Sequence, residues 1–303
     1  MASAESRVLV YDVGGSHISA AVFHREGNKV DGVVSAGYAP EQTTEAFLGV
    51  LHSLGTRATD GRPDVAGAAL AMPGPFDYEN GVSWMTHKLP YLYGFDLRQA
   101  LASRMGLAPA RVRFLNDAAA HLAGELTAGA AQGVGRAVSI TLGTGVGSAF
   151  AVDGLVVREG PGVPSGGEIW NLPYQGGILE DRISTRAIQK SYRERTGQER
   201  EVAAIAAAAS TEPAAAEVFN KFGHDLGVAL RTVLSSFAPD VIVIGGGIAK
   251  SAYLFLSAGQ DELSNLGAQL RISVLGDQAP LVGAGAAWFQ HEGSLSVPTA
   301  IPE

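Results

Sequence analysis

The chain reads VLVYDVGGSHISAAVF from Val8 to Phe23, and it reads AVSITLGTGVGSAFAV from Ala137 to Val152. Each stretch consists of an apolar run, a short glycine-rich turn and a second apolar run, which predicts two strands joined by a glycine turn. Glycine at such a turn lets backbone N–H groups approach a ligand without a Cβ in the way. Two matching turns in successive halves of the chain predict a duplicated domain that closes around a shared polyphosphate, with a nucleotide as the expected ligand.

Length and composition support this interpretation. The chain has 303 residues, which is more than one hydrophobic core usually serves, and this favours two domains. Hydrophobic residues make up 46% of the chain and its 39 glycines are dispersed, so a disordered or collagen-like protein is excluded. The formal net charge of −8 disfavours a nucleic-acid partner, because duplex binding depends largely on Lys and Arg.

The chain contains no cysteine, which excludes disulfides, a thiolate nucleophile and a cysteine-ligated zinc site. Its first residues, MASAESR, lack the apolar core of a signal peptide, and no window approaches the roughly 20 apolar residues that cross a bilayer. We therefore expect a cytoplasmic protein with no membrane partner. The seven histidines show no metal-ligand spacing, so we expect no histidine metal site.

Predicted buried strands end beside glycine, proline or acid, which is where α/β proteins place their sites. Residues 65–72 precede Pro73-Gly74-Pro75, residues 112–115 precede Asn116-Asp117, and residues 241–244 precede Gly245-Gly246-Gly247. A helical pattern follows Asp117. Its carboxylate is therefore either an N-cap of that helix or an acid that faces a cleft and accepts a proton, and the two roles can coexist.

A second set of acids lies beside glycines, at Gly167-Glu168 and at Leu179-Glu180. Carboxylates accept paired hydrogen bonds from the neighbouring hydroxyls of a sugar, whereas the plainer interpretation is a set of solvated surface acids. The aromatic stretch 84–95 follows the Pro-Gly-Pro turn and forms either a wall of a sugar cleft or ordinary hinge packing, with His87 and Lys88 as further candidates.

The order and spacing of these motifs resemble the ROK sugar kinases, which are bacterial glucokinases and relatives within the actin and hexokinase superfamily, over nearly the whole chain. The resemblance implies an α/β fold of the actin-like, hexokinase type, with two domains and a duplicated β-hairpin phosphate-loop core. It implies a smaller N-terminal domain of residues 1–116, joined by a C-terminal helix at 283–303, and a larger domain of residues 117–282. Sugar and ATP are expected in the cleft between them, in a homodimer.

The same resemblance implies an ATP-dependent kinase that transfers the γ-phosphoryl group to the 6-hydroxyl of glucose or a related hexose. Asp117 is the expected proton acceptor, and Asp12 is expected near Mg²⁺ or its waters. The expected sugar contacts, besides Asp117, are Gly74, Pro75, Asn116, Glu168, Asn171 and Glu180. The expected nucleotide contacts, besides Asp12, are Gly14, Gly15, Ser16, His17, Gly143, Thr144, Gly145, Gly245, Gly246 and Gly247.

One departure from the family pattern concerns metal. ROK proteins typically carry a zinc knuckle of one histidine and three cysteines between the two sugar-binding glutamates. Here Asn171 takes the place of the histidine, and the stretch NLPYQGG that begins with it has no cysteine. We therefore expect no structural zinc, a loop held by Pro173, Tyr174 and their packing, and an amide of Asn171 offered to the sugar.

Alternatives remain at this stage. A sugar-sensing regulator of the same family is one, although such repressors carry an N-terminal helix-turn-helix for which the first strand, near Val8, leaves no room. A kinase for fructose or an amino sugar is another, and polyphosphate is an alternative donor. A dinucleotide oxidoreductase is disfavoured, because the turn at Gly143–Gly147 misses the G-x-G-x-x-G spacing and precedes a strand.

Overall fold

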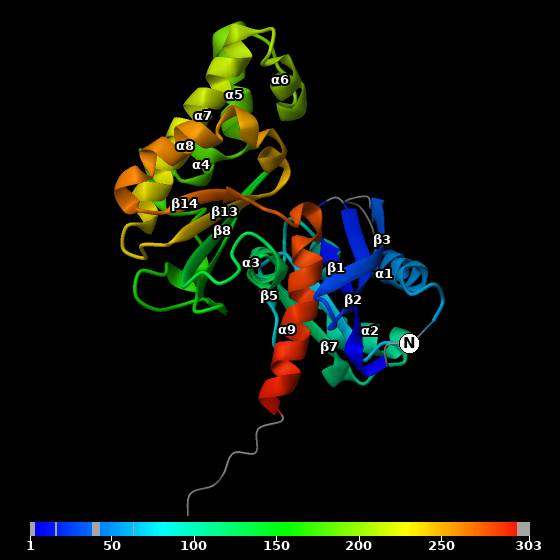
Figure 1. The fold of residues 1–303 in the computed structure, drawn as a ribbon. Coiled ribbons are helices and arrows are strands. Elements are labelled where there is room, and N and C mark those ends of the chain that lie inside the picture. The colour runs from blue at the N-terminus through cyan, green and yellow to red at the C-terminus, as the bar shows by residue number, and fades with distance from the viewer. Residues whose placement is uncertain (1–3, 16, 38–42, 63, 296–303) are drawn as a thin grey trace, which may run out of the picture. The chain divides into compact units, whose positions relative to one another are not determined.

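The computed structural model describes residues 4–15, 17–37, 43–62 and 64–295, with side chains as far as residue 291. Within this part the chain forms two compact units (Figure 1). The first contains the described residues up to Ala128 together with the segment that begins at Gln278, and the second contains Gly129–Asp277. The first unit is therefore built from two separate lengths of chain.

The first unit has a five-stranded sheet in the order β3-β2-β1-β4-β7. The first three strands are antiparallel neighbours, whereas β4 and β7 run parallel to β1. The strands are β1 (Arg7–Val13), β2 (His17–His24), β3 (Lys29–Gly37), β4 (Ala68–Met72) and β7 (Val112–Asn116). All five residues of β4 are buried, as expected for a central strand covered on both faces.

The second unit repeats this arrangement, with a sheet in the order β10-β9-β8-β13-β14. Its strands are β8 (Arg136–Leu142), β9 (Val146–Val152), β10 (Leu155–Val157), β13 (Val241–Gly245) and β14 (Gln269–Ile272). Again an antiparallel meander is followed by two parallel strands. Three residues join β1 to β2, and three join β8 to β9. The duplicated α/β architecture predicted from the two glycine turns is thus confirmed, and it extends over the whole of both sheets.

Helices and short elements complete each unit. In the first they are η1 (Ala4–Ser6), α1 (Thr44–Ala58), β5 (Phe76–Asp77), β6 (Val82–Ser83), η2 (Pro90–Leu92), α2 (Leu97–Met105), η3 (Pro109–Arg111), α3 (Asp117–Ala128) and α9 (Ala279–Leu295). In the second they are η4 (Ser165–Gly167), β11 (Pro173–Tyr174), β12 (Gly177–Ile178), α4 (Glu180–Ile183), α5 (Thr185–Thr196), α6 (Val202–Ala208), α7 (Pro213–Leu234), η5 (Gly247–Leu254), α8 (Leu256–Glu262) and η6 (Ser264–Leu266). The turn η7 (Gly276–Gln278) leads back to the first unit.

Helix α9 returns the chain to the first unit and packs against α3, β1 and β4 (Figure 1). Two glycines permit this close packing: a Cβ on Gly283 would lie 1.8 Å from the carbonyl oxygen of Ala120, and one on Gly124 would lie 2.1 Å from that of Ala279. Because α3 is held to α9 in this way, the first unit extends through Ala128, whereas the sequence predicted a domain boundary before this helix, after Asn116.

Helix α7 is the core helix of the second unit. Apolar side chains recur at helical spacing along residues 218–237, and Phe219, Leu226 and Leu230 on this stripe are buried, so the helix serves packing. The alanine-rich segment before it is divided into two helices, since α6 ends at Ala208 and α7 begins at Pro213, a residue suited to the first turn of a helix.

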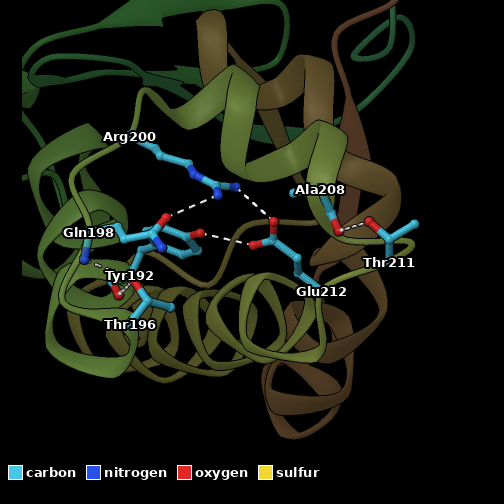
Figure 2. A network of polar contacts seen from close by, with 7 residues as sticks. All are labelled: Tyr192, Thr196, Gln198, Arg200, Ala208, Thr211 and Glu212. Carbon is cyan, nitrogen blue, oxygen red and sulfur yellow. Dashed lines mark hydrogen bonds and ion pairs between the residues drawn. The ribbon is translucent and has the colours of Figure 1, made fainter.

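A polar network joins α5 to the start of α7 (Figure 2). Its centre is the carboxylate of Glu212, which accepts a hydrogen bond from the Tyr192 hydroxyl at 2.9 Å and an ion-paired one from Arg200 at 2.9 Å. Arg200 also donates to the side chain of Gln198 and lies over the Tyr192 ring. The network fixes the connections on either side of α6.

Among the described residues, no single helix is both long and apolar enough to cross a membrane. Helices α6 and α7 are long and apolar enough only when they are taken together, and the chain bends by 117° at the break between them.

Candidate functional site

The first cluster of candidate residues lies at the carboxyl ends of three parallel strands in the first unit. In the sheet register Asp12 pairs with Ala71, and Ala71 with Leu115. One residue further on, Met72 pairs with Asn116. The first glycine turn, the Pro73–Pro75 turn and Asp117 therefore follow their strands at the same edge of the sheet, where α/β proteins bind ligands.

The pair Asn116 and Asp117 begins α3. The Asn116 Oδ1 atom accepts a hydrogen bond from the Ala119 N–H at 3.1 Å, and Asp117 Oδ1 accepts one from the Ala118 N–H at 2.8 Å. The capping role considered for this motif is therefore real, and Asn116 supplies its i to i+3 bond. The cap leaves the second carboxylate oxygen of Asp117 outside this backbone contact.

Tyr78 orients the Asn116 amide. Its hydroxyl accepts a hydrogen bond from Asn116 Nδ2 at 3.2 Å and donates one to the carbonyl oxygen of Met72, also at 3.2 Å. The Tyr78 ring packs against Phe76, with ring centroids 5.3 Å apart. The sequence analysis did not predict a role for Tyr78. The one feature of the sequence that pointed to it is its position three residues after Pro75, close to the Pro-Gly-Pro turn.

Electrostatics distinguish Asp117 from an ordinary surface acid. Burial raises the pKa of this carboxyl above its usual value, while the charge of Lys88 and the Ala118 N–H lower the pKa in part. A carboxylate with a raised pKa holds a proton more readily and is a better general base near neutral pH. The environment of Asp117 therefore suits proton acceptance.

The first glycine turn is open. Its Gly14 N–H donates to the carbonyl oxygen of His17 at 2.9 Å, and a Cβ on Gly15 would meet nothing within 4 Å. The His17 side chain is exposed. Ser16, a predicted nucleotide contact, lies outside the described residues.

Of the predicted sugar contacts, Gly74 and Pro75 are joined by a cis peptide bond, and Pro75 is exposed.

The second cluster lies in the second unit around its own glycine turn. Here the Gly143 N–H donates to the carbonyl oxygen of Gly145 at 3.0 Å. Glu180 Oε2 accepts a hydrogen bond from the Val146 N–H at 3.0 Å, and Arg186 pairs with Glu180 Oε1 at 2.7 Å. A predicted sugar contact, Glu180, thus binds the residue that directly follows the predicted phosphate turn.

Ser148 ties Glu168 to the same turn. Its hydroxyl donates to the carbonyl oxygen of Gly167 at 2.7 Å and accepts from the Ile169 N–H at 3.1 Å. The Glu168 side chain accepts a bond from Trp170 Nε1 at 3.0 Å, and the Glu180 N–H donates to the carbonyl oxygen of Trp170. The structure therefore brings Glu168, Glu180 and the second glycine turn together, with Asn171 exposed beside them.

A small hairpin, β11–β12, follows Asn171 in the stretch for which the sequence predicts a loop without zinc. Pro173 and Tyr174 form its first strand. Two residues outside the predicted sugar contacts hold it: Asp181 Oδ2 accepts from the Ile178 N–H at 3.1 Å, and Arg182 donates to the carbonyl oxygen of Gln175 at 3.0 Å. The described part of the chain contains no group of three or more His, Cys, Asp or Glu side chains arranged to hold a metal.

The third glycine motif ends β13 beside the second turn, since Gly245 pairs with Thr141 of β8. Gly246 has a φ of +81°, and a Cβ there would lie 2.4 Å from the carbonyl oxygen of Leu142. Gly247 begins η5, and a Cβ there would meet nothing within 4 Å. The motif therefore combines one glycine required by packing with one that leaves the backbone accessible.

Sequence comparison relates this chain to a known protein family. The sequence model that describes the ROK family matches residues 8–292, and the chain belongs to that family. A glucokinase from Halalkalibacterium halodurans is 25% identical, over 94% of this chain and 95% of that protein. An N-acetyl-D-glucosamine kinase from Haemophilus influenzae is 25% identical, over 80% of this chain and 85% of that protein.

Solved structures show the same fold. A ROK family glucokinase from Streptomyces griseus, crystallised in complex with glucose and AMPPNP, superposes with a TM-score of 0.78 at 24% identity. The match covers 94% of this chain and 99% of that one. The fold is therefore the hexokinase-type, actin-like fold of ROK proteins, as the motifs implied.

Proposed function

We propose that this protein is an ATP-dependent hexose kinase that phosphorylates the 6-hydroxyl of glucose or of a closely related hexose. The observation that carries the proposal is the position of Asp117, a carboxyl with a raised pKa at the strand edge that also bears the first glycine turn. Membership of the ROK family, with relatives named as kinases of glucose and of N-acetyl-D-glucosamine, supports the sugar as acceptor.

In this proposal Asp117 accepts the proton of the sugar 6-hydroxyl as that oxygen bonds to the γ-phosphorus. The bond between the γ-phosphorus and the bridging oxygen breaks, and ADP leaves. Phosphoryl transfer of this kind needs positioning and charge stabilisation more than covalent help from the protein. Asn116 in the first cluster, and Glu168, Asn171 and Glu180 in the second, orient the ring by accepting or donating hydrogen bonds to its hydroxyls.

The two glycine turns supply backbone N–H groups for the phosphates, and the exposed Thr144 adds a hydroxyl to the second turn. Mg²⁺, which offsets the charge of the phosphates when bound, is expected with ATP. Asp12 fits it, because this half-buried residue lies one position before the end of β1, close to the first turn. Magnesium in such sites is held by one or two carboxylates together with the substrate phosphates, so a dedicated cage of protein ligands is not required.

The test is ADP release with Mg·ATP over a panel that contains glucose, mannose, fructose, glucosamine and N-acetylglucosamine. Each reaction is run with and without a chelator that strips zinc but leaves magnesium. Sugar-dependent turnover that the chelator does not change is the expected result. If no sugar is turned over with ATP or with polyphosphate while sugar binding is still measurable, the protein is a sensor and the kinase proposal is wrong.

A further inference from the structure

An exposed arginine lies beside the second glycine turn. The Arg186 Nη2 atom donates to Glu180 Oε1 at 2.7 Å, while Glu180 Oε2 accepts the Val146 N–H at 3.0 Å. The guanidinium and the residue that ends the turn therefore share one carboxylate. The backbone makes a second connection, because the Thr185 N–H donates to the carbonyl oxygen of Gly143 at 2.9 Å. These two contacts hold Arg186 next to the turn.

The two partners of this ion pair differ in exposure. The Glu180 side chain is 17% exposed, whereas that of Arg186 is 64% exposed. Thr144 and Gly145, at the tip of the turn, are exposed as well. A guanidinium carries five N–H donors in a planar fork, and the bond to Glu180 uses one of them. The other donors are therefore accessible to a ligand at the turn.

The charge of Glu180 explains why a cation is needed here. A carboxylate this close to the turn repels the phosphates that the turn is proposed to bind, and a largely buried carboxylate is costly without a partner. The ion pair with Arg186 offsets both effects. Because a guanidinium also binds phosphate through paired N–H groups, Arg186 can attract the anion that Glu180 repels.

We propose that Arg186 is a donor-binding residue, whose guanidinium contacts the terminal phosphates of ATP at the second glycine turn while Glu180 holds it in place. The inference rests on the proposed function. It adds a side-chain cation to the backbone N–H groups and the Thr144 hydroxyl that the proposed function assigns to the phosphates. Arg186 takes part in no bond that forms or breaks, and its role is to position the phosphates and offset their charge.

Two other cations near the glycine motifs of this unit are directed elsewhere. Arg182 of α4 donates to the carbonyl oxygen of Gln175 in the small hairpin. Lys250 of η5 pairs with Asp277 at 3.0 Å. Among the described residues, Arg186 is thus the cation whose ion pair leads directly to the second turn.

The experiment measures the equilibrium binding of Mg·ATP, Mg·ADP and adenosine by titration calorimetry in the absence of sugar. It compares Arg186→Met and Arg186→Lys with the wild type and with Arg193→Met. Arg193 is the matched control, because it lies on the same helix, is 56% exposed and pairs with Glu199 at 3.0 Å.

We expect Arg186→Met to raise the Kd for Mg·ATP by about 10- to 100-fold, as for the loss of a hydrogen bond to a charged group. The rise should be smaller for Mg·ADP and absent for adenosine, which has no phosphate. Arg186→Lys keeps the charge and should recover part of the affinity, whereas Arg193→Met should bind like the wild type.

The dependence on phosphate number separates phosphate binding from a merely structural role. An equal loss of affinity for adenosine overturns the proposal, as does a wild type that binds no Mg·ATP. We also expect the loss to persist when Arg186→Met is combined with Glu180→Gln. Recovery of Mg·ATP affinity in this double variant would mean that Arg186 only masks the charge of Glu180, and the proposed phosphate contact would be wrong. If the wild type binds Mg·ATP but phosphorylates no sugar, the proposed function fails, and the comparison of Mg·ATP with adenosine still decides the role of Arg186.

Discussion

Glu180 Oε2 lies 3.0 Å from the backbone nitrogen of Val146 and accepts its hydrogen bond, so the acid that we propose to bind the sugar also holds the end of the second glycine turn. The same oxygen would lie 2.8 Å from a Cβ on Gly145. The Glu180 carboxylate thus contacts the second glycine turn, and in the proposed function it also binds the sugar. A change at either residue is expected to disturb the other.

The first prediction concerns this contact. Glu180→Ala removes the acceptor of the buried Val146 N–H, a loss of about 1–3 kcal/mol in the free energy of unfolding. It also raises the KM for both sugar and ATP. Glu180→Gln keeps an acceptor oxygen, so we expect it to raise mainly the KM for sugar. Thermal denaturation and steady-state kinetics of the two variants provide the measurement.

A double-mutant cycle provides the control. Gly145→Ala displaces the Glu180 carboxylate, so its effect on the KM for sugar is expected to be smaller in the Glu180→Gln background than in the wild type. Additive effects of the two changes would show that the contact has no functional role.

The second prediction separates activity from stability at Asp117. Asp117→Asn removes the proton acceptor, and we expect kcat to fall about 10²- to 10⁴-fold. Because burial raises the pKa of this carboxyl in the folded state, the ionised form opposes folding at neutral pH. The variant is therefore expected to melt at a higher temperature than the wild type at pH 7.

The sign of this effect reverses the usual behaviour of acids. A raised folded-state pKa contributes stability that is fully present below the unfolded pKa and is lost as the pH rises through the folded value. The difference in melting temperature should therefore shrink as the pH falls toward 3. Glu79→Gln, at an exposed acid of the same unit, is the matched control. Near-normal turnover of Asp117→Asn would remove Asp117 from the reaction.

The third prediction uses two adjacent glycines. Gly246→Ala places a Cβ 2.4 Å from the Leu142 carbonyl oxygen at a φ of +81°, and we expect it to cost more than about 2 kcal/mol in unfolding free energy. Gly247→Ala meets open space, so its stability should stay close to that of the wild type. If the nucleotide approaches this backbone, the KM for ATP rises in Gly247→Ala. Denaturant titration and kinetics on the same samples distinguish the two effects.

Much of the fold was predictable because its signals are local. The strand, glycine turn and strand at Val8–Phe23 and at Ala137–Val152 appear as β1–β2 and β8–β9, and the break before Pro213 separates α6 from α7. The packing of α3 on α9 was not predictable, since it depends on Gly124 and Gly283, which are 159 positions apart in the sequence. No local pattern records that approach, and it moves the boundary of the first unit to Ala128.

For the candidate site, too, local sequence patterns predicted some residues and missed those that depend on contacts distant in the sequence. Asn116 and Asp117 were predictable from where an apolar run stops, whereas Asp12 was expected only from the resemblance to the ROK sugar kinases. Tyr78, Ser148 and Arg182 were not predictable, because each acts through a hydrogen bond to a backbone or side-chain group brought near by the fold. Ser148 in particular sits in an ordinary strand pattern, and only the three-dimensional arrangement shows that it holds the segment of Glu168.

The fourth prediction concerns the network of Figure 2. Glu212→Gln removes the ion pair with Arg200 and weakens the bond from Tyr192, so we expect a lower melting temperature at pH 7. The Arg200 and Tyr192 hydrogen bonds lower the pKa of Glu212, so this stability is present above the unfolded pKa and is lost as the pH falls through the folded one. Wild type and variant should therefore converge in acid.

Its control is Glu217→Gln on α7, in a more exposed ion pair with Arg195 of α5. Exposed pairs contribute little to stability, so this variant should melt close to the wild type at both pH values. Equal changes in melting temperature for the two substitutions would mean that the Glu212 network stabilises the fold no more than a surface ion pair does.

The discontinuous first unit has a consequence for biosynthesis. Helix α9 covers α3, β1 and β4, yet it leaves the ribosome only after every residue of the second unit. Domains generally fold as units during synthesis, and here the second unit has all of its residues before the first does. The nascent first unit therefore cannot complete its packing until α9 is synthesised. Until then, the surface of α3, β1 and β4 that α9 covers stays exposed. We expect the chain to be more prone to aggregation during this interval than after α9 has packed.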